Sequence, residues 1–390
     1  MHERPQRAVA SLALGCLLLF SGSATYPAPR ATPFTSGSAA SPGDETERRA
    51  WGHAKDLAEQ IGRSGIVYED APLTAFAQSV VDRLYPEFRG RMRVTLLKSP
   101  HLNAFAIPDG NLYVNVGLIA RFQTEAQLAT VMAHEGVHFT HRHGYLSARN
   151  VKDNAAVATV GAMLGIPILP QLLAVSSIFG YSRELETEAD EAGYLRLAQA
   201  GYDVREAPRT FEHLLREVEL EDIKEPFFFS THPKLQERLG NMKRLSGSAH
   251  TGGDGSSRDA YSAVVRQARL DTLANLVSMG RGKQVIAMLE DAQTQAALPP
   301  EARFYLGEGY RLRGEAGDVD RAKGIYRQVA AAAPDYPPTY RALGVVLLKS
   351  GHKEEAARQF ERYLALAPDA VDRKYVESYL RMTRSEERPQ

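Results

Sequence analysis

Apolar and polar positions along this chain repeat first with a helical period and then with the period of a strand. Apolar side chains three or four positions apart over residues 44–62 and 73–84 predict two amphipathic helices. Residues 93–97 predict one strand, and the alternation over residues 112–116 predicts a second, entered through a turn at 108–110. The helical period then returns over 127–143 and 182–245, which predicts a mainly α domain with a small β-sheet, an α+β fold.

The predicted helix at 127–143 contains the sequence His134-Glu135-Gly136-Val137-His138, an H-E-x-x-H motif. Residues four apart share one face of a helix, so His134 and His138 can direct two imidazoles at one metal ion. Glu135 lies beside them, where it can take a proton from a metal-activated water. Zinc accepts nitrogen, sulfur and oxygen ligands, and its catalytic sites use three protein ligands. The motif therefore predicts one Zn²⁺ per chain and a third ligand elsewhere. The alternative is a helix with two surface histidines.

Candidates for the third ligand lie in the acidic segment 182–190. Glu186 and Asp190 are four residues apart and share a helical face. This spacing would let Glu186 bind zinc while Asp190 orients a ligand histidine or handles a proton. Glu184 and Glu188 share a different face. Without the H-E-x-x-H motif, a solvated acidic helix would be the better interpretation of this segment.

Further histidines and one arginine are candidates for the same site. An arginine can stabilise the oxyanion of a tetrahedral intermediate and a histidine can donate a hydrogen bond to it, so Arg238 and His232 are candidates. A single histidine before proline is more often a turn residue. His141 follows His138 by three residues and is a competing candidate ligand, whereas we expect His143 to support the structure or contact a ligand.

The first 24 residues have the pattern of a secretory signal peptide, with a basic start, an apolar stretch at 8–20 and small residues before cleavage after Ala24. This predicts export, with the periplasm of a Gram-negative bacterium as the best fit. The only cysteine, Cys16, partly matches a lipobox, so lipid anchoring is the alternative to simple cleavage. Residues 25–44 are rich in Ala, Pro, Ser and Gly and predict a disordered tether.

Residues 155–180 are almost wholly apolar and long enough to suggest a membrane span. A span there would place Glu186 across the membrane from the H-E-x-x-H motif, and two prolines and two glycines interrupt the segment. We therefore expect a buried hairpin or a flap beside the site. Peripheral contact with a membrane surface and an integral-membrane protein are the alternatives.

The Gly- and Ser-rich segment 246–260 predicts a linker between two domains. Beyond it, residues 302–368 contain tetratricopeptide signals, with closing prolines Pro334 and Pro368 separated by the 34-residue period of this repeat. A degenerate unit at 261–300 and a polar capping helix at 372–384 complete an all-α repeat solenoid at 261–386. Such arrays form concave surfaces that bind peptides and protein partners.

The charge composition of the chain does not alter these predictions of fold and function. Lys and Arg total 47, as do Asp and Glu, so the formal net charge is zero and gives no electrostatic argument for binding nucleic acid. If cleavage follows Ala24, the mature chain has no cysteine, and the zinc ligands must be histidines and carboxylates.

A set of motifs in a fixed order, spanning roughly residues 44–245, resembles zinc metallopeptidase family forty-eight, a gluzincin family. The motifs are the stretch 103–110, Val116-Gly117-Leu118, the H-E-x-x-H motif with Arg142-His143, Arg183 with Glu186 and Ala189-Asp190, the stretch 200–203, and Thr231-His232-Pro233 with Arg238. The resemblance implies a zincin-type peptidase domain at 45–245, in which His134, His138 and Glu186 bind zinc and Glu135 is the catalytic base. It also implies that Asp190 is an assisting acid and that His232 and Arg238 lie near the reacting carbonyl. The chain departs from the family at Asp109 and His141.

An exported peptidase of this family joined to tetratricopeptide repeats implies degradation of unfolded or misassembled envelope and outer-membrane proteins. The repeats would recruit substrates or the outer-membrane assembly machinery. We expect the strand at 112–116 to pair as a sheet edge with an extended substrate. The alternative is a chaperone-like assembly factor whose metal site is latent.

Overall fold

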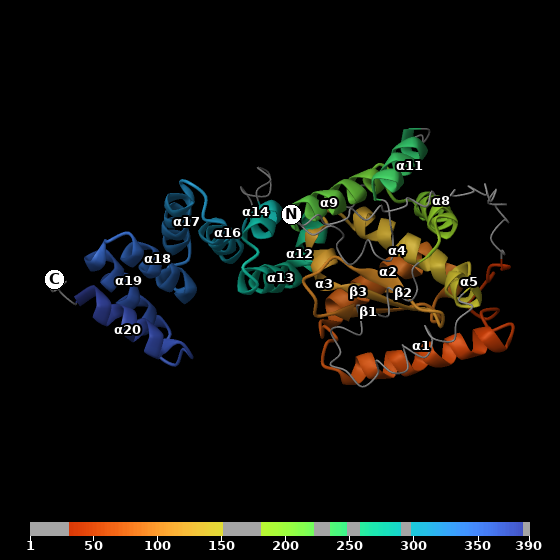
Figure 1. Ribbon diagram of the computed structural model, residues 1–390, viewed down its shortest axis with the longest axis horizontal. Helices are drawn as coiled ribbons and strands as arrows, with labels where there is room; N and C mark the ends of the chain where they lie inside the picture. The colour runs from red at the N-terminus through yellow and green to blue at the C-terminus, as the bar shows by residue number, and fades with distance from the viewer. Residues whose placement is uncertain (1–30, 151–180, 222–234, 248–257, 290–297, 385–390) are drawn as a thin grey trace, which may run out of the picture. The chain divides into compact units, whose positions relative to one another are not determined.

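The computed structural model describes residues 31–150, 181–221, 235–247, 258–289 and 298–384 (Figure 1). The predicted signal peptide, Cys16, the apolar segment 155–180 and His232 lie outside the described residues. Within the described residues, no helix combines the length and the apolar character that crossing a membrane requires.

A three-stranded mixed sheet forms the base of the N-terminal domain. Its strands are β1 (Arg93–Leu97), β2 (Ala104–Ala106) and β3 (Asn111–Asn115). The order in space is β1-β3-β2, with β3 parallel to β1 and antiparallel to β2. Both predicted strands are present, but the expectation that 112–116 is a sheet edge is wrong. β3 is the central strand and both of its edges are paired, so it cannot add a substrate strand.

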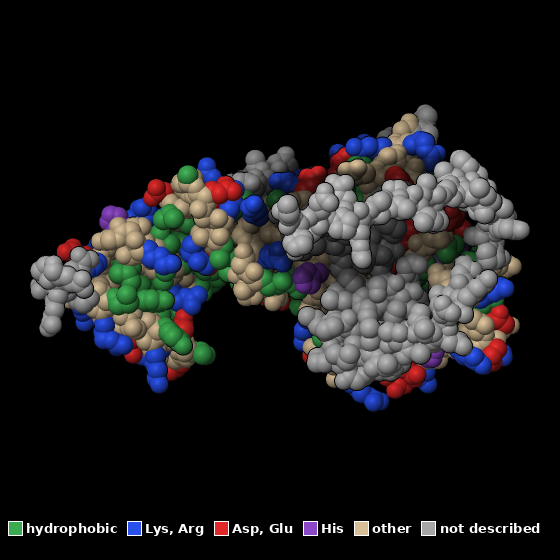
Figure 2. Space-filling model, in the orientation of Figure 1, with side chains coloured by type: hydrophobic (Ala, Val, Ile, Leu, Met, Phe, Trp, Pro, Cys, Tyr) green, Lys and Arg blue, Asp and Glu red, His purple; other side chains and the backbone are tan. Residues whose placement is uncertain are grey.

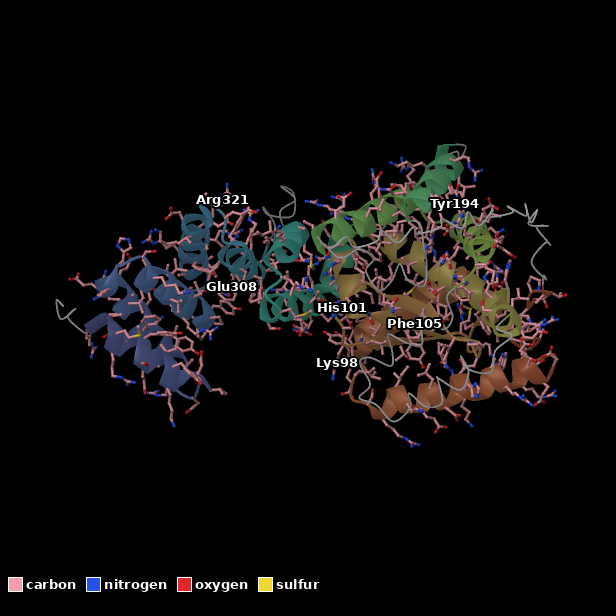
Figure 3. The ribbon with its side chains drawn as sticks, in the orientation of Figure 1. Lys98, His101, Phe105, Tyr194, Glu308 and Arg321 are labelled. Atoms are coloured by element: carbon pink, nitrogen blue, oxygen red, sulfur yellow. The ribbon has the colours of Figure 1, made fainter. Side chains whose placement is uncertain are left out.

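Helices cover both faces of this sheet, and alternate residues of each strand point to opposite sides (Figure 1). The predicted helix at 44–62 is α1 (Glu45–Arg63), which begins where the Asp44 side chain accepts from the backbone N–H of Glu47. Phe105 lies between the sheet and α1, stacked on Tyr113 with ring centroids 5.1 Å apart (Figure 3). The other face packs on α2 (Ala71–Leu84) and α4 (Glu125–Thr140).

The predicted long helices are present with different ends. The helix expected over 127–143 stops at Thr140, because Arg142 has a φ of 60° and the chain turns there before α5 begins. The block expected over 182–245 consists of separate helices. The remaining elements of this domain are η1 (Pro86–Phe88), α3 (Val116–Arg121), α5 (His143–Asn150), α8 (Arg183–Gln199), α9 (Glu206–Glu221) and α11 (Leu235–Gly247).

The expectation of a disordered tether over 25–44 does not hold for its described part, residues 31–44. The backbone N–H of Phe34 donates to the carbonyl of Thr140 at 2.8 Å. The Phe34 ring packs on Trp51 and Phe139, with ring centroids 6.3 and 5.7 Å away. Aromatic packing and backbone bonding therefore hold this segment on the domain.

The C-terminal part is wholly helical within the described residues and contains the expected helix pairs. Gly307 and Gly344 permit close packing inside the two pairs, because a Cβ atom at either position would lie 2.6 Å from the ring of Tyr326 or Phe360. Figure 3 shows Glu308 and Arg321 in the first pair, where Glu308 accepts from the buried Tyr326 hydroxyl. The helices are α12 (Arg258–Val264), α13 (Arg266–Ser278), α14 (Gly282–Leu289), α16 (Pro300–Arg313), α17 (Asp318–Ala332), α18 (Pro337–Lys349), α19 (Lys353–Leu366) and α20 (Arg373–Arg384).

The last helix, α20, is rich in charged and polar residues, as a capping helix was expected to be, but it also exposes hydrophobic side chains. Tyr375, Tyr379 and Met382 are exposed on it, and hydrophobic side chains gather on this end of the repeats in Figure 2. The prediction of a helix at 372–384 is nevertheless confirmed by α20.

Candidate metal centre

The helix α4 carries the H-E-x-x-H motif through the middle of the N-terminal domain. Every residue from Ala126 to Thr140 is buried. This agrees with the sequence of the helix, which is apolar on nearly all of its faces outside the motif. The helix starts where Thr124 accepts from the backbone N–H of Gln127, while the Gln127 side chain accepts in return from the N–H of Gln123. This reciprocal cap and the surrounding core hold the motif in a fixed position.

Three side chains from α4 and α8 converge on one point. The Nε2 atoms of His134 and His138 are 3.0 Å apart, and each lies 3.4 Å from a carboxylate oxygen of Glu186. Ligand atoms bound at about 2.0–2.1 Å around a tetrahedral zinc ion lie about 3.3–3.4 Å apart. The separations, the two imidazoles and the carboxylate therefore fit one zinc ion, and all three residues are buried.

The approach of α8 to α4 depends on Gly193. A Cβ atom at this position would lie 3.1 Å from the backbone nitrogen of His134, so a larger side chain would push the two helices apart. Glu186 and Asp190 lie on the face of α8 that this close packing brings against α4. The shared face that their four-residue spacing predicts is therefore the face that meets the histidines.

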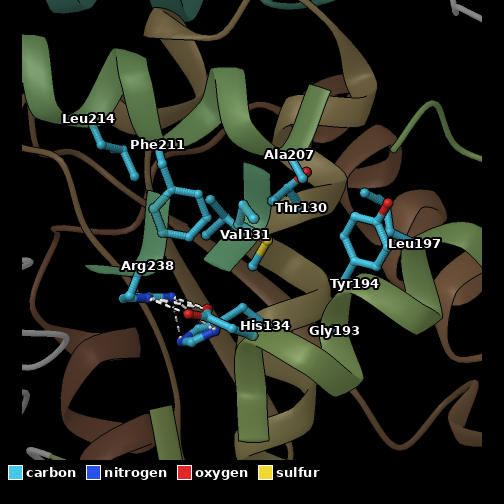
Figure 4. Close-up of a pocket in the computed structure, with 12 residues that line it drawn as sticks. Thr130, Val131, His134, Gly193, Tyr194, Leu197, Ala207, Phe211, Leu214 and Arg238 are labelled. Carbon is cyan, nitrogen blue, oxygen red and sulfur yellow. Dashed lines mark hydrogen bonds and ion pairs between the residues drawn. The ribbon is translucent and has the colours of Figure 1, made fainter. Parts of the chain in front are cut away.

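Behind the triangle lies a buried ionic network centred on Arg238 (Figure 4). Its Nε and Nη2 atoms lie 2.9 and 2.6 Å from the two oxygens of Asp190, and its Nη1 lies 3.3 Å from Glu186. Asp190 in turn lies 3.0 Å from Nδ1 of His134, the ring nitrogen that faces away from Glu186. Phe211 covers the guanidinium at 4.8 Å. The network fixes the orientation of the His134 ring.

Glu135 points from α4 toward the short strand β2. Its Oε2 accepts a hydrogen bond of 3.1 Å from the backbone N–H of Ala106, and its side chain is buried. Ile107 N–H donates to Asn111 O, and Asn103 O accepts from Asn115 N–H, so the backbone groups of Ile107 and Asn103 face the chain of β3. Ala106 lies between those positions, so its backbone groups point away from β3 and toward the site.

Burial and neighbouring charges shift the ionisation of this site. Burial lowers the pKa of His138 well below its usual range, which keeps its ring neutral and able to bind metal. Burial and Arg238 also disfavour charge on His134, but Glu186 and Asp190 outweigh them and raise the pKa of His134 to about 9. Burial opposes the charge of Asp190, yet Arg238 and His134 lower its pKa. A metal ion that binds here therefore competes with a proton for His134.

The structure brings six of the seven predicted site residues together: His134, Glu135, His138, Glu186, Asp190 and Arg238. The seventh, His232, lies outside the described residues. His141 is not in the triangle, because its ring pairs with Glu188 at 2.7 Å. His143 contacts the ligand His138 through a 2.9 Å separation of their Nδ1 atoms.

Two contributors were not identified from the sequence. The ring of Tyr181 stacks on His138 with centroids 3.7 Å apart and an interplanar angle of 11°. Its position just before the acidic segment carried no signal of that contact. The N–H of Ala106 was also missed, because a backbone donor on a three-residue strand leaves no pattern in the sequence.

Comparison with known proteins relates both parts of the chain to known families. Residues 69–246 match peptidase family M48, and residues 315–376 match a tetratricopeptide repeat. The chain is 36% identical over 151 residues to the mitochondrial metalloendopeptidase OMA1 of Arabidopsis thaliana, covering 37% of this chain and 30% of that protein. It is 27% identical over 292 residues to the beta-barrel assembly-enhancing protease of Escherichia coli O157:H7, covering 70% of this chain and 58% of the relative. The OMA1 protein of Schizosaccharomyces pombe is 32% identical over 154 residues, covering 38% of this chain and 44% of that protein. The matches thus span between 30% and 58% of these relatives' own lengths.

Proposed function

Because this chain belongs to peptidase family M48 through residues 69–246, we propose that it is a zinc-dependent endopeptidase. The observation that carries this proposal is the buried triangle of His134, His138 and Glu186 with Glu135 beside it. Zinc held there would supply Lewis acidity to a water molecule and to the scissile carbonyl. Three protein ligands leave the open position that catalytic zinc sites use.

Glu135 is the proposed general base. Glu135 follows the proposed ligand His134 directly in the sequence, and the Ala106 N–H holds its carboxylate in place. The carboxylate can therefore take the proton of the attacking water. It then passes that proton to the leaving amine as the peptide bond breaks. A carboxylate held between the metal ligands and a strand edge has the position that this transfer requires.

Asp190 and Arg238 are proposed to orient the zinc ligands. Asp190 lies against Nδ1 of His134, and its lowered pKa favours a carboxylate that accepts a hydrogen bond over an acid that donates a proton. Arg238 neutralises Asp190 and touches Glu186, which supports a role in holding the charged ligands. A contribution of His232 and Arg238 to oxyanion stabilisation stays a prediction.

We propose that β2, rather than β3, receives the substrate. The backbone groups of Ala104 and Ala106 face away from β3, so an extended polypeptide could add there as a further strand, taking over the Ala106 N–H that donates to Glu135 in the free protein. Main-chain hydrogen bonds give affinity with little dependence on side chains. This geometry suits unfolded or misassembled polypeptides, whose backbones are free to pair.

The setting of the activity is also a proposal. A relative is named a beta-barrel assembly-enhancing protease, and the sequence of residues 1–24 predicts export, which together support a periplasmic role on outer-membrane proteins. The repeats would recruit substrates or the assembly machinery, since such helical arrays bind protein partners.

The proposal is tested with the mature protein and an outer-membrane barrel protein presented unfolded in urea-free buffer or folded in detergent. We expect cleavage of the unfolded form, its loss on chelation, and its recovery with zinc. Cleavage that continues without metal would overturn the zinc assignment. Zinc binding without cleavage of either form would instead favour a chaperone-like factor with a latent site.

A further inference from the structure

A second cluster of metal-binding side chains lies beside the triangle, formed by His141, His143 and Glu188. One ligand atom from each lies within 4.8 Å of the others. The Nδ1 atom of His141 is 2.7 Å from one oxygen of Glu188, and the Nε2 atom of His143 is 3.8 Å from the other. This donor set, two imidazoles and a carboxylate, has the same composition as the triangle.

The break between α4 and α5 creates this cluster. Residues two apart on a continuous helix point in different directions, so His141 and His143 would not meet on an unbroken helix. The left-handed conformation of Arg142, with a φ of 60°, turns the chain so that both rings reach Glu188. Glu47 holds the Arg142 guanidinium through contacts of 2.9 and 2.5 Å, which stabilise this turn.

A buried ring nitrogen in the cluster has no hydrogen bond. His143 is fully buried, its Nδ1 lies 2.9 Å from Nδ1 of His138, and its Nε2 finds no hydrogen-bond partner among the described residues. Leaving such a group unsatisfied costs free energy, which a bound ion would recover. The side chains of His141 and Glu188 are 25% and 36% exposed, so an ion can reach the cluster from solvent.

We propose that His141, His143 and Glu188 form a second site for a divalent transition-metal ion of the zinc type. Imidazole and carboxylate donors suit zinc and cobalt. Two of its three ligands are partly exposed, and their separations of 2.7 and 3.8 Å from Glu188 have to adjust before all three can bind one ion. The second site therefore fills after the buried triangle.

The contact between His138 and His143 couples the two sites. When His138 binds metal through Nε2, its proton lies on Nδ1 and points at Nδ1 of His143. Metal on Nε2 of His143 puts that ring's proton on Nδ1 as well, so two N–H groups face each other. Filling the second site therefore disturbs a ligand of the first, and excess metal lowers activity.

The test is a cobalt titration of the metal-free, full-length protein, followed by visible absorption and equilibrium dialysis. Wild type should bind two Co²⁺ ions with the second held more weakly, and His141→Gln should bind one. His352→Gln is the matched control, because His352 is an exposed histidine of the repeats, and it should bind two. One ion in wild type, or two in His141→Gln, would overturn the second site.

Circular dichroism checks that each variant is folded. If His141→Gln does not fold, Glu188→Gln gives a second way to remove the site. The metal count does not depend on the proposed peptidase activity. The coupling does rest on it: excess Co²⁺ should inhibit wild type and His352→Gln but spare His141→Gln. Equal inhibition of all three would refute the coupling while leaving the metal count to decide the site.

Discussion

Removing the guanidinium of Arg238 should destabilise the N-terminal domain strongly, and more so without metal. Arg238 is 4% exposed and forms ion pairs with Asp190 at 2.6 Å and Glu186 at 3.3 Å. Arg238→Met keeps most of the side-chain volume but leaves two buried carboxylates without this cation. Breaking a buried pair in this way costs about 3–5 kcal/mol. Zinc would neutralise part of the charge on Glu186, so the loss should be smaller in the zinc-loaded protein.

Urea unfolding followed by tryptophan fluorescence measures the loss of stability in the N-terminal domain. The chain has one tryptophan, Trp51 on α1, which packs against Phe34 and Arg91 and so reports on the peptidase domain. A loss of 3–5 kcal/mol corresponds to a midpoint lower by about 1–2 M urea. The experiment is run with chelator and again with zinc.

Arg48→Met is the matched control. Arg48 also forms an ion pair, with Glu45 at 2.8 Å, but both side chains are more than half exposed. Exposed pairs contribute about 0–1 kcal/mol, so this variant should hardly move the midpoint. If Arg238→Met lowers the free energy of unfolding no more than Arg48→Met does, the buried ionic network around Arg238 does not stabilise the fold. An equal loss with and without zinc would contradict the link between Arg238 and the ligand Glu186.

Three further predictions concern other parts of the chain. Gly136→Ala should cost about 1–3 kcal/mol in the same fluorescence assay, because its Cβ would lie 2.2 Å from the ring of Tyr85; an unchanged midpoint would contradict this packing. Phe360→Ala should cost the repeats about 3–5 kcal/mol, seen as earlier loss of helical circular dichroism on heating, since this ring is fully buried. Hydrogen bonds from Arg313 lower the pKa of Asp318 below its ordinary 3.8, so its stabilisation is present above pH 3.8 and is lost as pH falls through the lower folded value. Asp318→Asn should therefore lose stability less steeply than wild type on acidification below pH 4, and parallel curves would refute the pairing.

The sequence predicted those parts of the fold whose signal is local. The strand predicted over 93–97 matches β1, and the helix predicted over 44–62 matches α1 to within one residue at each end. The four-residue spacing of Glu186 and Asp190 correctly predicted that they share a face. In each case neighbours along the chain are enough to determine the structure.

The predictions that were wrong concern features that depend on contacts between segments distant in the sequence. β2 has three residues that are all buried, so it shows no alternation, and its presence makes β3 central rather than an edge. The end of α4 depends on the left-handed turn at Arg142, which Glu47 stabilises from another helix. The stacking of Tyr181 on His138 likewise depends on packing between distant segments. Strand order and contacts of this kind follow from tertiary packing, which a single sequence does not reveal.

The most direct test of the proposed zinc endopeptidase activity is the activity and metal content of Glu135→Gln. The substitution keeps the size of the side chain and leaves His134, His138 and Glu186 in place. We predict that the variant holds as much zinc as wild type at the triangle and does not cleave casein, which wild type cleaves. A variant that cleaves casein at the wild-type rate with its zinc retained would contradict the assignment of Glu135 as the base.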